Sequence, residues 1–354
     1  MSQSKIGMGA PEYFPAFDWL RLGLALTVAL FHAGAVTDEN IGNFAVQVFF
    51  ALSGWLIGGI LLDSDASALP RFYFNRAARI WAPYFFAVAL VFGMSLMSEP
   101  ADAHWFEYLF YDVTFTHNWF ISPRIEEINA DLPLRGAGII FWSLSVEEQF
   151  YLFAPLMILF ARWGRMPTMW AALAVFAIVL ETFYGSIALG VLAAVLRRRF
   201  GDWHLKGMAP ALFAAVFLLC VFLYARFPEE YLRIAPFAAV SAVLLLARAG
   251  KKSRIGAFAG GVSYPLYLNQ WIGVFFAREI ALDFPDHQLI VTVLLSVILN
   301  LAIASLLYLA IDAQVRKRRN EWFTPARGRA AAMIAYGLII LGGVGGLLIA
   351  LMRL

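Results

Sequence analysis

The chain has 354 residues, of which 62% are hydrophobic and 14% are charged, and its formal net charge is +3. A soluble globular domain is about half apolar and about a quarter charged, so this composition excludes an ordinary soluble domain. The small positive charge is spread over the loops and therefore does not indicate nucleic-acid binding.

Runs of apolar residues long enough to cross a membrane recur along the whole chain. We therefore expect an all-α, polytopic membrane helical bundle with about 10–11 transmembrane helices. The fifth and sixth spans are short and meet at Tyr184–Ser186, so they could form a re-entrant pair. The eleven candidate spans are residues 14–35, 43–62, 77–97, 143–161, 168–183, 185–197, 208–226, 231–248, 257–277, 289–311 and 331–351.

The charges of the expected loops predict the orientation of the bundle. Basic loops alternate with loops that are acidic or mixed, and removing one span breaks this alternation. Because cytoplasmic loops carry the excess of Lys and Arg, we expect the N-terminus in the cytoplasm and the C-terminus outside. The basic loops are residues 71–79, 162–165, 197–206, 248–254 and 316–319.

No cleavable signal, disulfide or metal motif is visible. The first apolar run lacks a small-residue cleavage site near its end, so we expect it to remain as a membrane span. The single cysteine, Cys220, excludes an intramolecular disulfide and a multi-cysteine metal site. The chain has no Gly-rich nucleotide loop, HExxH or CxxC, so we expect no metal.

The first span carries two ionisable side chains, Arg21 and His32, which are eleven positions apart. Eleven residues of helix rise about 16 Å and return to nearly the same face. Because ionisable groups at membrane depth are costly, they often mark a functional site, and an imidazole suits general-base work on a hydroxyl. Alternatively, His32 bonds a backbone carbonyl and Arg21 reaches the headgroups.

The basic start of the third span contains Arg76 and Arg79, which are three residues apart and share a helical face. Arginine pairs bind phosphates through several hydrogen bonds. The alternative is that both residues anchor the span at the cytoplasmic surface, as most basic residues in such loops do.

The longest expected loop, residues 98–142, lies on the outer face and is rich in aromatic residues, which argues for an ordered structure. Within it, Trp119 and its neighbour Asn118 are candidate substrate contacts, because an aromatic ring can stack on a sugar. No paired broken-helix halves are visible, which weakens a transporter interpretation.

The segment WSLSVEEQFY, residues 142–151, enters the fourth span from outside. Ser145 and Glu148 have the spacing of a capping box, which predicts a helix start at Ser145. Glu147 and Glu148 are candidate catalytic residues, since carboxylates at a membrane entrance could orient or charge-balance His32. Ser143 and Ser145 are candidate substrate contacts.

Three further features have ordinary structural explanations. The small-residue notch at Phe49–Trp55 is typical of helix packing. Asn269 and Gln270, inside a span, could hydrogen-bond between helices, and Asp312 could pair with the basic cluster that follows it.

Taken together, the motifs resemble the acyltransferase-3 family of membrane acyltransferases over residues 14–318. The resemblance is carried by Arg21 with His32, and then in chain order by VFFALSGWLI, NRAARIWAPYF, HNW, WSLSVEEQFYL, SYPLYL and Tyr308 to Arg316. It implies transfer of an acyl group, commonly acetyl, from cytoplasmic acyl-CoA to a sugar hydroxyl of an envelope or exported glycan.

The resemblance also implies roles for individual residues. His32 matches the family's essential histidine, and Glu147 and Glu148 fall in its acidic serine motif. Our own hypothesis is that His32 is the general base, with Glu147 or Glu148 raising its basicity, and a two-step route through an acyl-enzyme is the alternative. Arg21, Arg76 and Arg79 match conserved arginines. We expect Arg76 and Arg79 to hold the phosphates of CoA and Arg21 to line the path of the pantetheine arm.

This sequence departs from the family pattern at two places: Gln270 stands where a histidine is common, and Asp312 to Arg316 replaces Glu-x-Pro-x-Arg. Gln270 cannot act as a base, so we expect the catalytic load to rest on His32. Some members carry a fused soluble outer domain, and with the sequence ending at Leu354 we expect any such partner to be a separate protein or unnecessary.

We therefore expect a multi-pass protein of the bacterial inner membrane, with residues 1–13 as a cytoplasmic segment, 14–318 as the acyltransferase-3 domain and 319–354 as an extra transmembrane helix. We expect no permanently bound cofactor. The expected partners are acetyl-CoA or another acyl-CoA, a glycan or glycolipid acceptor and membrane lipids. The glycines of the last span could pack on another helix of the chain or join two copies in a homo-oligomer: Gly342, Gly343, Gly345 and Gly346.

Two other functions use the same residues. One is a non-enzymatic transporter or flippase of an acylated glycan or lipid, and the other is an acyltransferase acting on a lipid, a peptide or a small molecule. Consumption of a thioester separates the enzymes from the transporter, because a transporter releases no free CoA.

Overall fold

The computed structural model describes residues 12–97, 100–128 and 131–353, and these residues form helices and connecting loops with no β-strand among them. The expected all-α membrane bundle is confirmed. Five apolar segments are long enough to cross a membrane by length and composition, namely Glu39–Leu62, Ala66–Ser95, Ala209–Arg226, Pro285–Trp322 and Pro325–Met352. The expected segment 1–13 falls almost wholly outside the described residues.

Each of the eleven expected spans coincides with one helix of the structure. The fifth and sixth spans form an antiparallel pair, α9 and α10, joined by residues 180–183. The helices are α1 (Pro15–His32), α2 (Glu39–Leu62), α3 (Leu69–Ser95), α8 (Phe141–Pro155), α9 (Pro167–Val179), α10 (Tyr184–Phe200), α11 (Ala209–Arg226), α12 (Tyr231–Leu246), α13 (Arg254–Ala281), α14 (Gln288–Leu307) and α16 (Pro325–Met352).

Several helix starts follow from capping residues in the sequence. The side chains of Asp38, Ser253 and Thr324 accept hydrogen bonds from backbone N–H groups at the starts of α2, α13 and α16. The capping box predicted at Ser145 is wrong, because α8 begins four residues earlier at Phe141. Ser145 lies inside the helix, where its hydroxyl donates to the carbonyl of Phe141 at 3.3 Å.

The two described ends of the chain lie at opposite ends of the bundle. Glu12 forms an ion pair with Arg197 at 2.6 Å, at the C-terminal end of α10. At the other end, Arg353 after α16 pairs with Glu107 in α4 (Ala103–Val113), a helix of the long loop. This arrangement fits an odd number of crossings, while the side that faces the cytoplasm stays a prediction.

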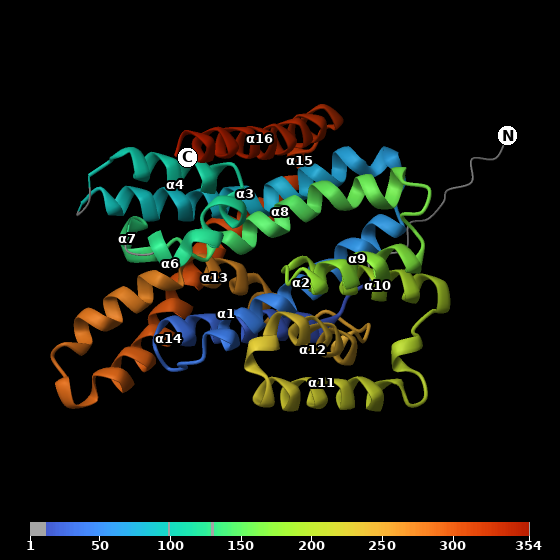
Figure 1. Ribbon diagram of the computed structural model, residues 1–354, viewed down its shortest axis with the longest axis horizontal. Coiled ribbons are helices and arrows are strands. Elements are labelled where there is room, and N and C mark those ends of the chain that lie inside the picture. The colour runs from blue at the N-terminus through green and yellow to red at the C-terminus, as the bar shows by residue number, and fades with distance from the viewer. Residues whose placement is uncertain (1–11, 98–99, 129–130, 354) are drawn as a thin grey trace.

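The helices pack side by side, with α1 next to α2 and α13, and α13 also next to α14 (Figure 1). On the other side of the bundle, α16 lies along α3, and α8 contacts α2 (Figure 1). Helices α1 and α13 run in the same direction, because Asp18 lies against Gly260 near their starts and His32 bonds Gln270 further along both. This packing surrounds the site described below.

The long loop is ordered where the structure describes it, as its aromatic residues predict. It contains α4, α5 (His117–Phe120), α6 (Ile125–Ile128) and α7 (Pro133–Gly136). The glycines of α16 pack on this loop within the same chain, since a Cβ added at Gly342 would overlap Thr114 and one added at Gly346 would overlap Phe120. A homo-oligomer through this helix stays a prediction.

The small-residue notch of α2 packs against α10, as predicted. A Cβ added at Gly54 would overlap the carbonyl of Ile187, and one added at Gly190 would overlap the carbonyl of Ala51. The backbones of the two helices are therefore in direct contact, which holds the neighbouring residues of α2 at fixed positions.

We predict that Gly54→Leu destabilises the protein by about 1–3 kcal/mol, because the new side chain must push α2 away from α10. The thermal midpoint of unfolding in detergent, followed by size-exclusion fluorescence, should fall. Gly59→Leu is the matched control, since a Cβ at Gly59 of the same helix meets nothing within 4 Å. Equal midpoints for the two variants would contradict the close contact.

Candidate active site

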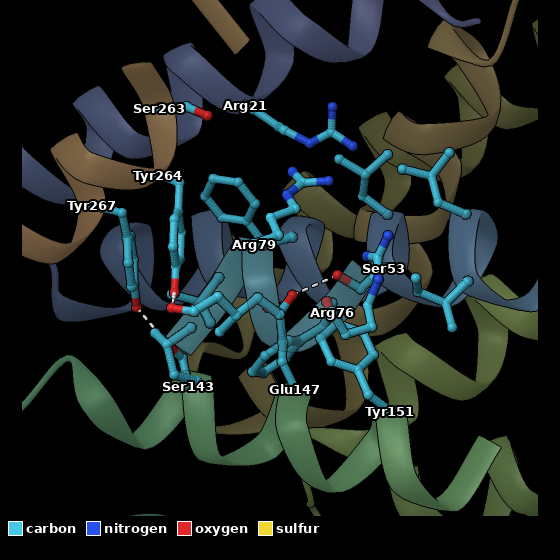
Figure 2. Close-up of a pocket in the computed structure, with 18 residues that line it drawn as sticks. Arg21, Ser53, Arg76, Arg79, Ser143, Glu147, Tyr151, Ser263, Tyr264 and Tyr267 are labelled. Carbon is cyan, nitrogen blue, oxygen red and sulfur yellow. Dashed lines mark hydrogen bonds between the residues drawn. The ribbon is translucent and has the colours of Figure 1, made fainter. Parts of the chain in front are cut away.

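A cavity of about 110 Å³ lies between α1, α2, α3, α8 and α13. Arginine side chains gather on one side of the cavity, and Ser143, Tyr264 and Tyr267 lie on the other (Figure 2). Its lining residues are Arg21, Val46, Phe49, Phe50, Leu52, Ser53, Leu56, Ile57, Arg76, Arg79, Ile80, Ser143, Leu144, Glu147, Tyr151, Ser263, Tyr264 and Tyr267.

The structure brings together the three arginines singled out in the sequence. Arg21 reaches the cavity from α1 and lies 3.5 Å from the carboxylate of Asp18, while Arg76 and Arg79 reach it from α3. Within the described ranges, neither Arg76 nor Arg79 forms an ion pair or a hydrogen bond, and Arg76 instead packs over the ring of Tyr151 at 5.7 Å. A cavity with unpaired guanidinium groups suits an anionic ligand, because a buried charge is costly until it is paired.

Glu147 is the carboxylate that faces this cavity. Its Oε1 accepts a hydrogen bond from the hydroxyl of Ser53 at 2.5 Å (Figure 2). Ser53 was not a candidate in the sequence, because the notch that contains it indicated helix packing. A serine inside a helix commonly bonds a carbonyl of the preceding turn, so this contact with a carboxylate of another helix could not be predicted from spacing.

The opposite side of the cavity carries hydroxyl groups from α8 and α13. The hydroxyls of Ser143 and Tyr267 are 2.6 Å apart, and Tyr264 donates to the carbonyl of Ile80 at 3.3 Å. Ser143 was a candidate substrate contact. Tyr264 and Tyr267 were not candidates, although both belong to the SYPLYL segment that supported the resemblance.

His32 lies outside the set of residues that line the cavity. Its Nδ1 is 2.9 Å from the carbonyl of Val28 and 3.3 Å from Oε1 of Gln270, which follows Tyr267 by three residues on α13. The alternative in which His32 bonds a backbone carbonyl predicted the contact with Val28, and that contact is present. Gln270 forms a hydrogen bond between helices, as predicted. Whether His32 is catalytic stays a prediction.

The structure does not bring the two carboxylates of α8 to His32. Glu148 accepts a hydrogen bond from the indole of Trp81 at 3.2 Å, on a different side of the helix from Glu147. In the part of the chain that the structure describes, no hydrogen bond or ion pair joins either glutamate to His32. An effect of these carboxylates on its basicity would have to act over a longer distance.

The remaining candidate substrate residues lie elsewhere. Asn118 exchanges hydrogen bonds with Gln149 at 3.0 and 2.8 Å, and Ser145 is buried in α8. Trp119 lines a second, apolar cavity of about 520 Å³ between α8, α9, α10 and α16. Of the four predicted substrate contacts, Ser143 lines the arginine-lined cavity, whereas Asn118, Trp119 and Ser145 do not.

Asp312 interacts electrostatically with Arg316 of the basic cluster that follows it, but without a close ion pair. Its side chain is buried at the end of α14, and it forms no ion pair among the described residues. The segment that carries it, Tyr308–Asp312, is a π-helical turn, which changes the direction of the side chains that follow.

A sequence profile described as an acyltransferase domain matches residues 14–309 of the chain. Among curated proteins, the chain is 30% identical over 166 residues to an O-acetyltransferase OatA of Staphylococcus aureus, covering 43% of this chain and 26% of that protein. It is 29% identical over 171 residues to a peptidoglycan O-acetyltransferase OatA of Listeria monocytogenes, covering 44% and 26% of the two chains.

The chain is 29% identical over 161 residues to a putative peptidoglycan O-acetyltransferase, YrhL, of Bacillus subtilis. This alignment covers 42% of this chain and 24% of that protein. The chain thus spans about a quarter of the length of these relatives. No solved structure matches.

We predict that Arg76→Met keeps the fold and raises the thermal midpoint. The change removes a partly buried cation that forms no ion pair among the described residues and retains an unbranched side chain, a replacement worth about 1–3 kcal/mol when the site repacks. Arg233→Met is the control, because Arg233 is exposed and has carboxylate partners in Glu181 and Glu230. A lower midpoint for Arg76→Met than for this control would mean that the arginine stabilises the bundle.

Proposed function

Since the chain belongs to the acyltransferase domain family, whose profile matches residues 14–309, we propose that it is an integral membrane O-acetyltransferase that transfers acetyl from cytoplasmic acetyl-CoA to a hydroxyl of an envelope glycan. The names of the Listeria and Bacillus relatives indicate peptidoglycan as their acceptor, which makes a cell-wall glycan our first candidate. The expected location is the bacterial inner membrane.

The arginines of the cavity carry this proposal, and two of them, Arg76 and Arg79, form no ion pair among the described residues. Arg76 and Arg79 are in the first three turns of α3, and Arg21 is in the second turn of α1. The N-terminal end of α1 lies beside a basic loop, since Gly250 donates to the carbonyl of Tyr13 at 2.9 Å. If the basic loops are cytoplasmic, these arginines face the compartment that supplies acyl-CoA, and they bind its phosphates.

The cavity then extends outward from these arginines. Its outer part is lined by Phe49 and Tyr267, whose rings lie 6.0 Å apart, and His32 is further along α1. The rise of the helix from Arg21 to His32 is about 16 Å, a distance that an extended pantetheine arm can cover. The phosphates would therefore stay at the inner end while the thioester approaches His32.

In the reaction, the acceptor hydroxyl oxygen attacks the thioester carbonyl carbon and the carbon–sulfur bond breaks. The acetyl group is then an ester of the acceptor, and the sulfur leaves as the CoA thiolate. His32 would accept the proton of the hydroxyl, which makes the oxygen a stronger nucleophile. A transporter that uses the same residues as a path would release no free CoA.

We predict that Arg79→Gln weakens the binding of acetyl-CoA by roughly tenfold, as expected for the loss of one charge-assisted contact with a phosphate. Isothermal calorimetry on the protein in nanodiscs measures the dissociation constant. Arg226→Gln, an exposed position at the end of α11, should bind as the unmodified protein does. Unchanged binding by Arg79→Gln would return this residue to the role of a membrane anchor.

We predict that His32→Ala binds acetyl-CoA normally but loses acceptor-dependent release of CoA by about 10²-fold or more, because the general base is absent. Free CoA is measured with a thiol reagent, using nanodisc protein and muropeptides as acceptors. His287→Ala is the control, since His287 lies in a short turn before α14. Turnover retained by His32→Ala would exclude the base assignment.

A further inference from the structure

The imidazole of His32 is connected to α13 as well as to its own helix. Its Nδ1 lies 2.9 Å from the carbonyl oxygen of Val28 and 3.3 Å from Oε1 of Gln270. The backbone carbonyl of His32 accepts a hydrogen bond from Arg278 at 3.0 Å. Because His32 is the last residue of α1, these contacts hold a position where helices commonly fray.

The orientation of the Gln270 amide follows from its second hydrogen bond. Its Nε2 donates to the carbonyl oxygen of Tyr267 at 3.3 Å, an atom that can only accept. The amide nitrogen therefore faces Tyr267, and Oε1 faces the imidazole. Gln270 is 1% exposed, so water does not compete for this contact.

Both partners of the Nδ1 atom are thus acceptors, one a carbonyl oxygen of the backbone and the other an amide oxygen. A ring nitrogen between two acceptors carries the hydrogen, so the neutral ring is the Nδ1–H tautomer. Its lone pair is then on Nε2. In the described part of the chain, Nε2 of His32 forms no hydrogen bond.

We propose that Gln270 is a positioning residue that, with the Val28 carbonyl, holds His32 as the Nδ1–H tautomer and makes Nε2 the atom that accepts the acceptor's proton. This inference rests on the proposed function and adds to it the identity of the base atom. Nε2 takes the hydroxyl proton while the oxygen–carbon bond forms and the carbon–sulfur bond breaks. The imidazolium then returns that proton to the departing thiolate, which yields CoA and the neutral ring.

The place of Gln270 in the fold supports a role in the reaction. It follows Tyr267, which lines the arginine-lined cavity, by three residues, or nearly one helical turn. Its neighbour Asn269 is equally buried but uses its amide nitrogen for the carbonyl of Pro265 in its own helix. Of these two amides, Gln270 is the one that connects the wall of the cavity to His32.

The kinetic test compares Gln270→Leu, which removes the acceptor, with Gln270→Glu, which keeps one. Gln270→Leu should lower kcat for acetyl transfer by about tenfold and leave the KM for acetyl-CoA unchanged, because ring orientation affects the chemical step and not coenzyme binding. Gln270→Glu should retain kcat within about threefold. Asn269→Leu is the matched control and should keep the unmodified kcat if the fold is intact.

The tautomer is tested separately on the full chain in nanodiscs with ¹⁵N-labelled histidine, and the His32 signals are assigned by their loss in His32→Ala. We expect a protonated Nδ1 and an unprotonated Nε2 at neutral pH. An Nε2–H tautomer, or an unchanged kcat in Gln270→Leu, would overturn the inference. Failure of the proposed function looks different, because the unmodified protein would then release no acceptor-dependent CoA whatever the residue at position 270. Failure of the base assignment alone would leave His32→Ala active.

Discussion

The burial of positive charge inside an apolar bundle is the constraint on which the site depends. Arg76 and Arg79 are partly buried and form no ion pair among the described residues, although Glu147 lines the same cavity, and Arg21 pairs with Asp18. Such an excess of charge is unfavourable in a low-dielectric interior unless a ligand neutralises it. The arginines lower the free energy of unfolding, and the packed apolar core around the cavity must offset this loss. An anionic coenzyme that binds the folded protein would raise the free energy of unfolding again.

The positions of the helices could be predicted from the sequence, because apolar runs and loop charges report directly on membrane spans. The site could be predicted in part: Arg21, Arg76, Arg79 and Glu147 converge on one cavity. The contacts across helices could not, since no periodicity indicates that a serine of α2 meets a carboxylate of α8. The predicted helix start at Ser145 failed because a local capping pattern occurred within a longer helix.

The adjacent pair Glu147 and Glu148 illustrates how helix geometry separates roles that sequence proximity suggests are shared. Neighbouring residues of an α-helix point about 100° apart. Glu147 accordingly faces the arginines and Ser53, whereas Glu148 accepts from Trp81 of α3. A joint action of both carboxylates on His32 is therefore difficult to arrange, and the nearest polar side chain to that imidazole is an uncharged amide.

The helix α16 lies beyond the region matched by the family profile, which ends at residue 309. Its glycines are in contact with Phe110, Phe120 and Thr114 of the long loop, so this loop and the last helix form one packed unit. A larger side chain at one of these glycines would therefore need a smaller side chain at the loop residue that it contacts. A larger side chain in the loop would likewise need the glycine to be kept. The shape of the surface that the long loop forms is thus linked to a helix that the matched domain does not include.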